Sequence, residues 1–219
     1  MSDFMPMESS YTRVSSKVNP NAIIRIVPGH FATTHSHITT YVDMTIMKSR
    51  RSEAEAAASV LAHKYTTSTY VDTIICMDGC EVIGAYLADR LTQSGIMSLN
   101  KHHTMYVVSP ELNPSGQLIF RDNMQFMVDG KHCILLLASA TTGRTIARAL
   151  ECIEYYHGIV EGISAIFSAS KTVNGHEINS IFSADDVPDY KTYDARECPL
   201  CKQGVKLDAI VNSYGYSRI

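Results

Sequence analysis

The chain has 219 residues, of which 45% are hydrophobic and 19% are charged. A chain of this size buries roughly 70% of its unfolded surface, so we expect one globular domain with additions and no disulfide or metal staple for its core. The formal net charge of −3 argues against a nucleic-acid partner held by bulk charge. No apolar stretch reaches the length of a membrane span, and residues 1–16 lack the basic and apolar regions of a signal peptide. We therefore expect a cytoplasmic protein with no membrane and no nucleic-acid partner.

The N-terminal part is predicted to contain two short strands and the start of a helix. Residues 23–27 form the first strand, which should end at a turn made by Pro28 and Gly29. A segment rich in Thr and His follows, and residues 41–44 form the second strand. A helix should start near Ser52, because Ser52 and Glu55 have the spacing of a capping box.

Strands and helices alternate in the middle of the chain. The predicted strands cover 70–77, 104–108, 118–120, 125–128, 132–137 and 159–168, and the predicted helices cover 81–93 and 144–156. This alternation predicts an α/β fold with a parallel sheet flanked by helices. The chain divides into an N-terminal segment (1–48), an α/β core (49–184) and a tail (185–219) that we expect to be irregular.

The most informative segment joins the strand at 132–137 to the helix at 144–156. Its loop contains Ala140, Thr141, Thr142, Gly143, Arg144 and Thr145. The first N–H groups of a helix have no partner within the helix and lie at the positive end of its dipole, so they attract anions. The threonine hydroxyls add donors, and the glycine allows close approach of a ligand. A phosphate site and an ordinary strand-to-helix turn capped by a threonine both fit this pattern.

The run Thr141-Thr142-Gly143-Arg144-Thr145 resembles the phosphoribosyl-diphosphate motif of type I phosphoribosyltransferases. The resemblance extends over roughly residues 29–170 and is greatest to orotate phosphoribosyltransferases, which serve pyrimidine biosynthesis. It implies that residues 140–145 bind a 5′-phosphate and that Met77, Asp78, Gly79 and Cys80 form the pyrophosphate loop. It also implies a small N-terminal hood over the nucleobase, with Phe31, Thr33, Thr34 and His35 as base contacts, Mg²⁺ as cofactor and a homodimer as assembly.

Two departures from the family pattern concern catalysis. The family's two acidic residues should fall at Leu137 and Ala138, and no Asp or Glu occurs between Asp129 and Glu151. The family's Lys-rich mobile loop corresponds to residues 109–116, which contain no Lys or Arg. The nearest cationic side chains are Lys101, His102 and His103 on one side and Arg121 on the other. Losing the acid pair should weaken stabilisation of positive charge on the ribosyl group.

Asp78 admits three interpretations. Its carboxylate could hold magnesium indirectly, could repel a diphosphate, or could simply cap the helix that follows. The sequence does not decide among them.

Cysteines and histidines suggest a second kind of chemistry. Six cysteines are too sparse for a disulfide scaffold, and those at 76, 133 and 152 lie in apolar surroundings, so we expect buried free thiols. Cys198 and Cys201 have the spacing of a zinc half-site. His176, Cys80 or the same pair of a second subunit could complete it, whereas two free thiols or a redox pair are the alternatives. The histidines at 30, 35 and 37 also suggest a metal, although we favour solvated or base-contacting roles because no nearby ligand completes a set.

Two functional hypotheses follow. The first is an active phosphoribosyltransferase that joins a nucleobase such as orotate to phosphoribosyl diphosphate. The second is a catalytically impaired relative that binds a nucleotide or phosphosugar as a sensor or assembly subunit. The phosphate loop fits both, and the missing acid pair favours the second.

Overall fold

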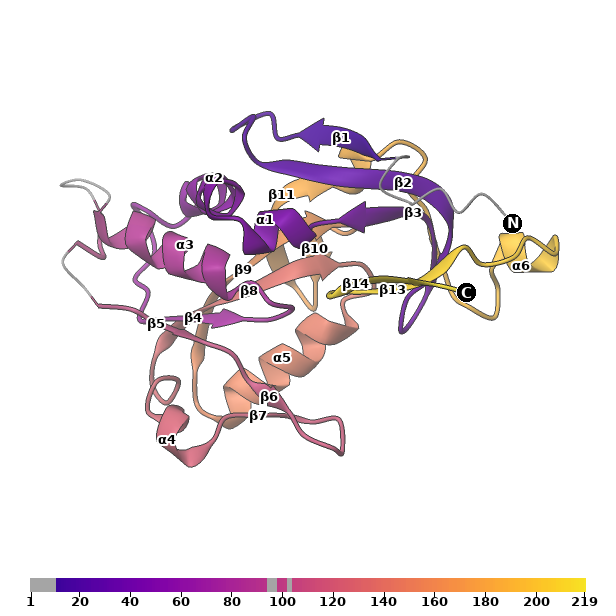
Figure 1. Cartoon of the computed structure of the whole chain (residues 1–219). Helices are drawn as coiled ribbons and strands as arrows, with labels where there is room; N and C mark the ends of the chain where they lie inside the picture. Colours follow the sequence, from indigo (N-terminus) through magenta and orange to yellow (C-terminus); the bar gives the residue numbers. More distant parts are fainter. Residues whose placement is uncertain (1–10, 94–97, 102–103) are drawn as a thin grey trace.

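The computed structural model describes residues 11–93, 98–101 and 104–219. Its core is a six-stranded sheet in the order β10-β11-β9-β8-β4-β5, in which every neighbouring pair is parallel except β10 with β11. Helices cover both faces of this sheet (Figure 1). The predicted α/β fold with a parallel sheet and flanking helices is therefore confirmed. No helix within the described ranges is long and apolar enough to span a bilayer.

The elements of the core follow the predicted segments closely. The strands are β4 (Thr73–Cys76), β5 (Tyr106–Val108), β8 (His132–Ala140), β9 (Ile159–Ser168), β10 (Thr172–Val173) and β11 (His176–Ser183). The helices are α1 (Thr45–Ser49), α2 (Arg51–Ala62), α3 (Glu81–Gln93) and α5 (Arg144–Tyr155). The predicted bounds of α3 and β9 are confirmed, and α5 ends one residue earlier than predicted.

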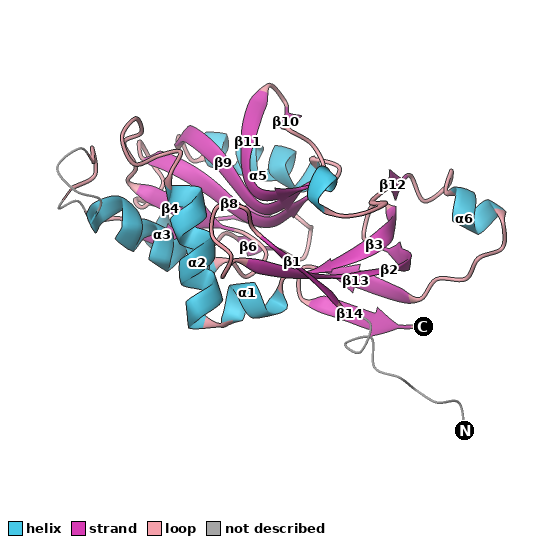
Figure 2. Ribbon diagram, turned by 90° about the horizontal axis from the view of Figure 1, so that it is seen from above, coloured by secondary structure: helices cyan, strands magenta, loops and turns pink. Residues whose placement is uncertain are grey.

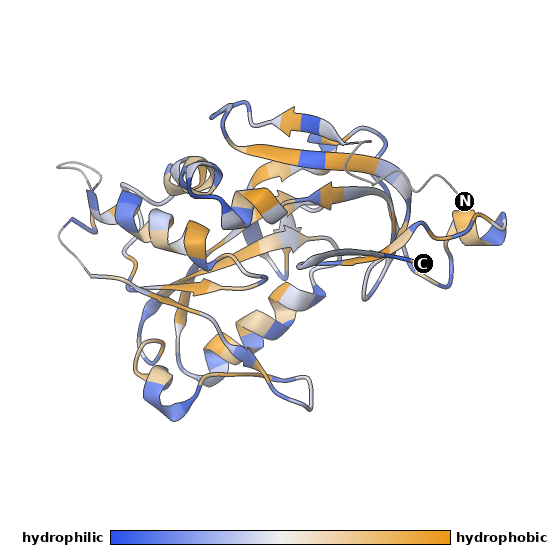
Figure 3. Ribbon diagram, in the orientation of Figure 1, coloured by the Kyte–Doolittle hydropathy of each residue, from blue (hydrophilic) through white to orange (hydrophobic). Residues whose placement is uncertain are grey.

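Alternate residues of the central strands enter two separate hydrophobic cores. Ile74 and Leu136 pack with α2 and α3 on one face, whereas Ile75 and Leu135 pack with α5 on the other. Side chains of a strand point alternately to opposite faces, so a strand covered on both sides reads as a continuous apolar run. Figure 3 shows this contrast between the mostly hydrophobic central strands and the two-sided helix α5.

A second sheet forms the hood beside the core. Its order is β12-β3-β2-β13-β14, and β1 pairs with β2. The bounds are β1 (Thr12–Ser15), β2 (Ile23–Ala32), β3 (His37–Asp43), β12 (Thr192–Tyr193), β13 (Ala209–Asn212) and β14 (Gly215–Arg218). Figure 2 shows one end of this sheet extending away from the helices of the core, whereas Ile24, Ile26 and Val42 of β2 and β3 pack with α2 and α3. The hood therefore combines N-terminal and C-terminal strands.

The expectation of an irregular tail is wrong. The tail contains a short 3-10 helix (Ala184–Asp186), β12, α6 (Pro199–Lys202) and the hairpin β13–β14. In β13, buried Ala209 and Val211 alternate with exposed Ile210 and Asn212, and β13 pairs in parallel with the end of β2. The strand is only four residues long, and its pairing partner lies far away in the sequence, which is why local patterns missed it.

The turn predicted at Pro28 and Gly29 is also wrong, because β2 continues through both residues. The pairing of β2 with β3 shifts register between Pro28 and Phe31, and such a bulge accommodates a proline that cannot donate to the ladder. A Cβ on Gly29 would lie 2.6 Å from Oδ2 of Asp208. The strand therefore passes so close to the C-terminal segment that a larger residue at position 29 would have to displace the Asp208 side chain and the Phe31 ring.

The capping box predicted at Ser52 and the strand predicted at 125–128 are both wrong. Helix α2 begins at Arg51 without a side-chain cap, and the Ser52 hydroxyl donates to the neighbouring Glu53, so the predicted capping box does not form. The strand predicted at 125–128 is instead the end of helix α4 (Asp122–Gln125) and a turn. Between β5 and α4 the chain forms a small hairpin of β6 (Glu111–Leu112) and β7 (Leu118–Ile119).

Candidate functional site

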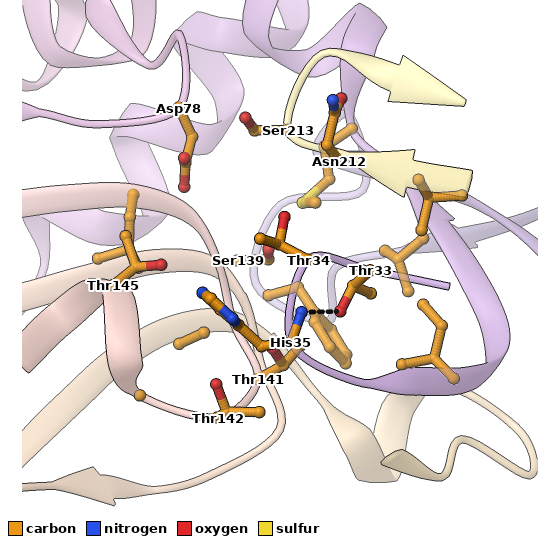
Figure 4. Close-up of a pocket in the computed structure, with 18 of the residues that line it drawn as sticks. Thr33, Thr34, His35, Asp78, Ser139, Thr141, Thr142, Thr145, Asn212 and Ser213 are labelled. Atoms are coloured by element: carbon orange, nitrogen blue, oxygen red, sulfur yellow. Dashed lines mark hydrogen bonds between the residues drawn. The ribbon is translucent and has the colours of Figure 1, made fainter. Parts of the chain in front are cut away.

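A pocket lies between the hood and the carboxyl ends of β4 and β8. In open α/β sheets this edge is where ligands bind. Its lining comes from the β2–β3 loop and β3, the turn after β4, the end of β8, the loop before α5 with the first turn of that helix, and the β13–β14 turn, together with Phe167 of β9 and Tyr190. Figure 4 shows the polar side chains of these segments pointing into one cavity. The sequence motifs at 33–35, at 78 and at 140–145 are thus brought together.

The loop before α5 has the geometry of an anion site. Gly143 adopts a left-handed conformation (φ 74°) at the N-cap of α5, and no side chain caps the helix. The first N–H groups of α5 are therefore left for a ligand. The pocket lining includes Thr141, Thr142 and Thr145 with Ala140 and Gly143. Arg144 is exposed and is not part of this lining, so its predicted phosphate contact is not supported.

We expect Gly143→Ala to destabilise the protein more than Gly175→Ala. Both glycines have positive φ, 74° and 81°, but a Cβ at Gly143 would meet both methyl groups of Val173 at 2.9 Å, whereas nothing lies within 4 Å at Gly175. A left-handed alanine costs about 1 kcal/mol, and the clash at Gly143 adds an expected cost of about 1–2 kcal/mol. Urea unfolding of the two variants measures the difference. Equal urea midpoints for the two variants would contradict the expected clash between a Cβ at position 143 and Val173.

The turn after β4 places one carboxylate in the pocket. Asp78 and Gly79 both have positive φ (59° and 75°), and the Asp78 side chain lines the cavity (Figure 4). Met77 and Gly79 do not line it, and Cys80 is fully buried in the core, so burial raises its thiol pKa. Of the four residues predicted for the pyrophosphate loop, only Asp78 faces the pocket.

Opposing effects act on the pKa of the Asp78 carboxyl. Burial raises the pKa of its carboxyl, while the charge of Lys48 and the nearby N–H of Ala138 and hydroxyl of Ser213 oppose that rise. Lys48 is buried; its Nζ donates to the backbone oxygen of Asp78 at 2.7 Å and to that of Ser213. The sequence analysis missed Lys48, whose local pattern carries no signal.

Leu137 and Ala138, which stand where the family motif has its two acids, face opposite sides of the sheet. Leu137 lines the pocket and is 1% exposed. Ala138 points to the opposite face and is fully buried in the core beneath α2 and α3. Ser139, two residues after Leu137, also lines the pocket. The pocket therefore has an apolar wall where the family motif places its first acid, and its carboxylate comes from Asp78 instead.

The hood contributes a polar loop to the lining of the pocket. Thr33, Thr34 and His35 line the pocket, and the Thr33 hydroxyl fixes the loop by accepting from the N–H groups of His35 and Ser36. The His35 side chain extends from the hood toward Thr141 and Thr142 of the loop before α5 (Figure 4). Phe31, in contrast, is 1% exposed and packs inside the hood, so the predicted base contact at this residue is wrong.

The C-terminal hairpin supplies pocket residues that the sequence analysis did not predict. Asn212 and Ser213 lie at the turn between β13 and β14 and line the cavity. The segment Asn212-Ser213-Tyr214-Gly215 between two short alternating runs is a hairpin signal. Reading the tail for hairpins would have found them.

The cationic side chains considered for a catalytic loop lie elsewhere. Arg121 donates two hydrogen bonds to Glu111, at 2.8 and 2.7 Å, on the exposed β6–β7 hairpin. Lys101 is exposed, and His102 and His103 fall outside the described residues. Among the residues that the structure describes, no Lys or Arg lines the pocket.

Cys198 and Cys201 lie outside the pocket, at the far end of the hood. The two partners suggested within the chain are not there, because Cys80 is buried in the core and His176 begins β11. His30 and His37 lie beside them instead. The cysteines at 76, 133 and 152 are buried and free, as predicted.

Comparison with solved structures defines the class of fold. The chain has the fold of the type I phosphoribosyltransferases. It is similar to a phosphoribosyltransferase from Corynebacterium diphtheriae, with 15% identity and a TM-score of 0.51 over 74% of this chain and 90% of that one. It is also similar to the orotate phosphoribosyltransferase from Aeropyrum pernix, with 16% identity and a TM-score of 0.51 over 83% of this chain and 93% of that one.

A third similar structure is the orotate phosphoribosyltransferase of Mycobacterium tuberculosis in complex with Fe(III) dicitrate. It is 13% identical, with a TM-score of 0.51 over 75% of this chain and 93% of that chain. No protein-family model matches the sequence, and no curated protein matches it.

Proposed function

We propose that the chain is a phosphoribosyltransferase-like protein whose pocket binds phosphoribosyl diphosphate and transfers its phosphoribosyl group to a nucleobase such as orotate. The observation that carries the proposal is the loop before α5, where uncapped helical N–H groups, a left-handed glycine and three threonines line one cavity. This arrangement suits the dianionic 5′-phosphate. The similar solved structures include orotate phosphoribosyltransferases, which supports the substrate class.

The proposal also assigns pocket residues to the ribose, the diphosphate and the base. With the 5′-phosphate at residues 140–145, the ribose would lie along Leu137 and Ser139, and the diphosphate would lie near Asp78. The base would lie under the hood loop, near Thr34 and His35. The same proposal, on the family resemblance alone, includes a homodimer.

Mg²⁺ fits this site as a cofactor bound together with the substrate. Magnesium is typically held by one or two carboxylates and by the phosphates of the substrate, and Asp78 supplies one carboxylate in the pocket. When bound, the ion would offset the charge of the diphosphate. This role matters here because no Lys or Arg of the described segments lines the pocket, and an unscreened Asp78 would repel the diphosphate.

The residues of the chain then act mainly by orientation and charge. The loop before α5 would fix one end of the ribose, and the Asp78 carboxylate would lie near the ribosyl carbon that bears the diphosphate, where positive charge develops. Preorganised groups that stabilise developing charge commonly provide the largest part of catalysis. Lys48 would act indirectly, because its ammonium group holds the Asp78 backbone and the β13–β14 turn in place.

The second candidate function is binding without transfer. It is favoured by the apolar Leu137 at the position of the family's first acid. In that case the pocket holds a phosphosugar or nucleotide, and the chain acts as a sensor or assembly subunit.

An assay of pyrophosphate release tests the first function. The protein is incubated with phosphoribosyl diphosphate, Mg²⁺ and one base at a time, beginning with orotate. Release that depends on both the base and the protein, with formation of the nucleoside monophosphate, is the expected result. Binding of phosphoribosyl diphosphate without release for any base would favour the second function.

Leu137→Glu separates the two functions further. Leu137 lines the pocket and is also packed in the core beside α5, so a carboxylate there would approach the ribose at a cost in stability. If the chain is a transferase, we expect kcat to rise about tenfold or more, because one carboxylate of the motif is restored. Leu137→Gln is the matched control of similar size without charge. Equal kcat values for the two variants would contradict transfer limited by the missing acid. Ala138→Asp is unsuitable, because Ala138 is fully buried in the core.

A further inference from the structure

Four potential metal ligands meet outside the pocket. His30 lies on β2, His37 lies on β3, and Cys198 and Cys201 lie at the start of α6. Their ligand atoms all lie within 4.8 Å of one another. We call these residues the His/Cys cluster. Figure 2 shows α6 beyond the ends of β2 and β3, away from the helices of the core.

The distances within the His/Cys cluster match the edges of a tetrahedron around zinc. Zn–N bonds of about 2.0–2.1 Å and Zn–S bonds of about 2.3 Å place two nitrogens about 3.3 Å apart and a nitrogen and a sulfur about 3.6 Å apart. Nε2 of His30 lies 3.2 Å from Nδ1 of His37. The sulfur of Cys198 lies 3.4 Å from His30 Nε2. The sulfur of Cys201 lies 3.7 Å from His30 Nε2 and 3.3 Å from His37 Nδ1.

A hydrogen bond fixes the histidine that is most buried. The other ring nitrogen of His30, Nδ1, lies 3.0 Å from the backbone oxygen of Val205. A carbonyl oxygen only accepts, so Nδ1 carries the proton and the lone pair of Nε2 faces the cluster. Metal-bound histidines are commonly oriented in this way by a carbonyl behind the ring.

Backbone hydrogen bonds beside the cluster join β2 to the C-terminal tail. The N–H of His30 donates to the Asp208 carboxylate at 2.7 Å, and the N–H of Asp208 donates to the backbone oxygen of His30 at 2.8 Å. His30 and Cys198 are each 1% exposed, and Cys201 is exposed. Two imidazoles and two thiolates form a complete tetrahedral set, which is typical of a structural zinc site with no position left for a substrate.

We propose that these four residues bind one structural Zn²⁺, which fastens the β2–β3 hairpin of the hood to the C-terminal tail. Both segments continue into the pocket. His37 is two residues from His35, and α6 leads into β13 and the pocket residue Asn212. The ion would therefore fix the distance between two walls of the pocket. A second subunit is not needed to complete the site.

Metal analysis of the full chain, purified without added metal, tests the proposal. We expect about one zinc per chain, and we expect Co²⁺ exchanged into the site to give the visible absorption of tetrahedral cobalt with thiolate charge-transfer bands. Cys201→Ser and His37→Gln should lower the zinc content and the cobalt absorption about tenfold or more. Cys152→Ser is the control, because Cys152 lies on α5, packs in the core and is not part of the cluster.

Three outcomes would overturn the proposal. The first is a wild-type chain that carries no zinc and takes up neither Zn²⁺ nor Co²⁺ at micromolar concentration. The second is equal zinc in Cys201→Ser and Cys152→Ser. The third is a Cys198–Cys201 disulfide in the purified protein, which mass spectrometry of alkylated peptides would detect and which would indicate a redox pair. None of these readouts depends on transfer activity, so the zinc site and the proposed function fail independently.

Discussion

The double variant Thr141→Val, Thr145→Val is expected to bind phosphoribosyl diphosphate roughly 100-fold or more weakly than the wild-type chain. Both threonines line the pocket at the start of α5, and valine keeps their shape while removing the hydroxyl. A hydrogen bond to a charged group contributes about 1.5–3 kcal/mol, and every 1.4 kcal/mol or so is a tenfold change in affinity. Calorimetric titration with the Mg²⁺ complex measures the loss.

Thr172→Val provides the matched control for that variant. Thr172 is an exposed threonine on β10 and is not part of the pocket lining. Its replacement should leave the affinity unchanged. If the double variant binds as tightly as Thr172→Val, the phosphate is held elsewhere, and the loop before α5 is a structural turn.

Asp78→Asn is expected to lower pyrophosphate release by about 100-fold or more while increasing stability at neutral pH. Loss of one preorganised group that acts on the transition state typically costs a factor of about 10²–10³ in kcat. The gain in stability has a different cause. Because burial raises the pKa of this carboxyl, the folded state holds its proton more tightly than the unfolded state does. The free energy of unfolding therefore falls as the pH rises from the ordinary pKa of an aspartate through the raised one.

In Asp78→Asn the amide does not ionise, so this side chain makes no pH-dependent contribution to the free energy of unfolding. The difference in unfolding free energy between variant and wild type should widen over that pH window and stay constant above it. Urea unfolding at a series of pH values measures this difference. Asp185→Asn, at an exposed residue outside the pocket, is the control for both readouts. A variant that releases pyrophosphate at the wild-type rate would show that Asp78 is not the carboxylate of the site.

The sequence predicted the core of the fold because its signals are local. Buried parallel strands read as apolar runs, such as residues 132–137, and α3 and β9 were predicted with the bounds that the structure has. The loop before α5 was predicted as a strand-to-helix connection for the same reason, since Thr141 to Thr145 are contiguous and Gly143 lies at the start of a helix; its binding of a phosphate stays a prediction. A motif made of neighbouring residues can be recognised in the sequence without knowledge of tertiary contacts.

The parts that sequence reasoning missed depend on contacts between distant segments. Lys48 meets Ser213 across 165 positions, and Cys198 meets His30 across 168. Each half of the His/Cys cluster was noticed separately, but no pattern in the sequence pairs the β2–β3 hairpin with α6. The turn predicted at Pro28 failed similarly, because the bulge in β2 is stabilised by pairing with β3 and by contact with Asp208.

The carboxylate of the pocket does not come from the segment that matches the family motif. The end of β8, with Leu137 and Ser139, supplies no carboxylate to the pocket, and the neighbouring turn after β4 supplies one through Asp78. The left-handed backbone of Asp78 and Gly79 turns that side chain into the cavity. Backbone conformation of this kind has a cost and is often retained where it serves a ligand.

The central claim is that the pocket binds a phosphoribosyl compound through the loop before α5. Calorimetric titration of the wild-type chain with phosphoribosyl diphosphate, with and without Mg²⁺, tests it most directly. We predict one binding site per chain, tighter binding when Mg²⁺ is present, and competition by inorganic phosphate. Absence of binding in both conditions, with a folded protein confirmed by cooperative unfolding, would contradict the account and leave residues 140–145 as an ordinary strand-to-helix turn.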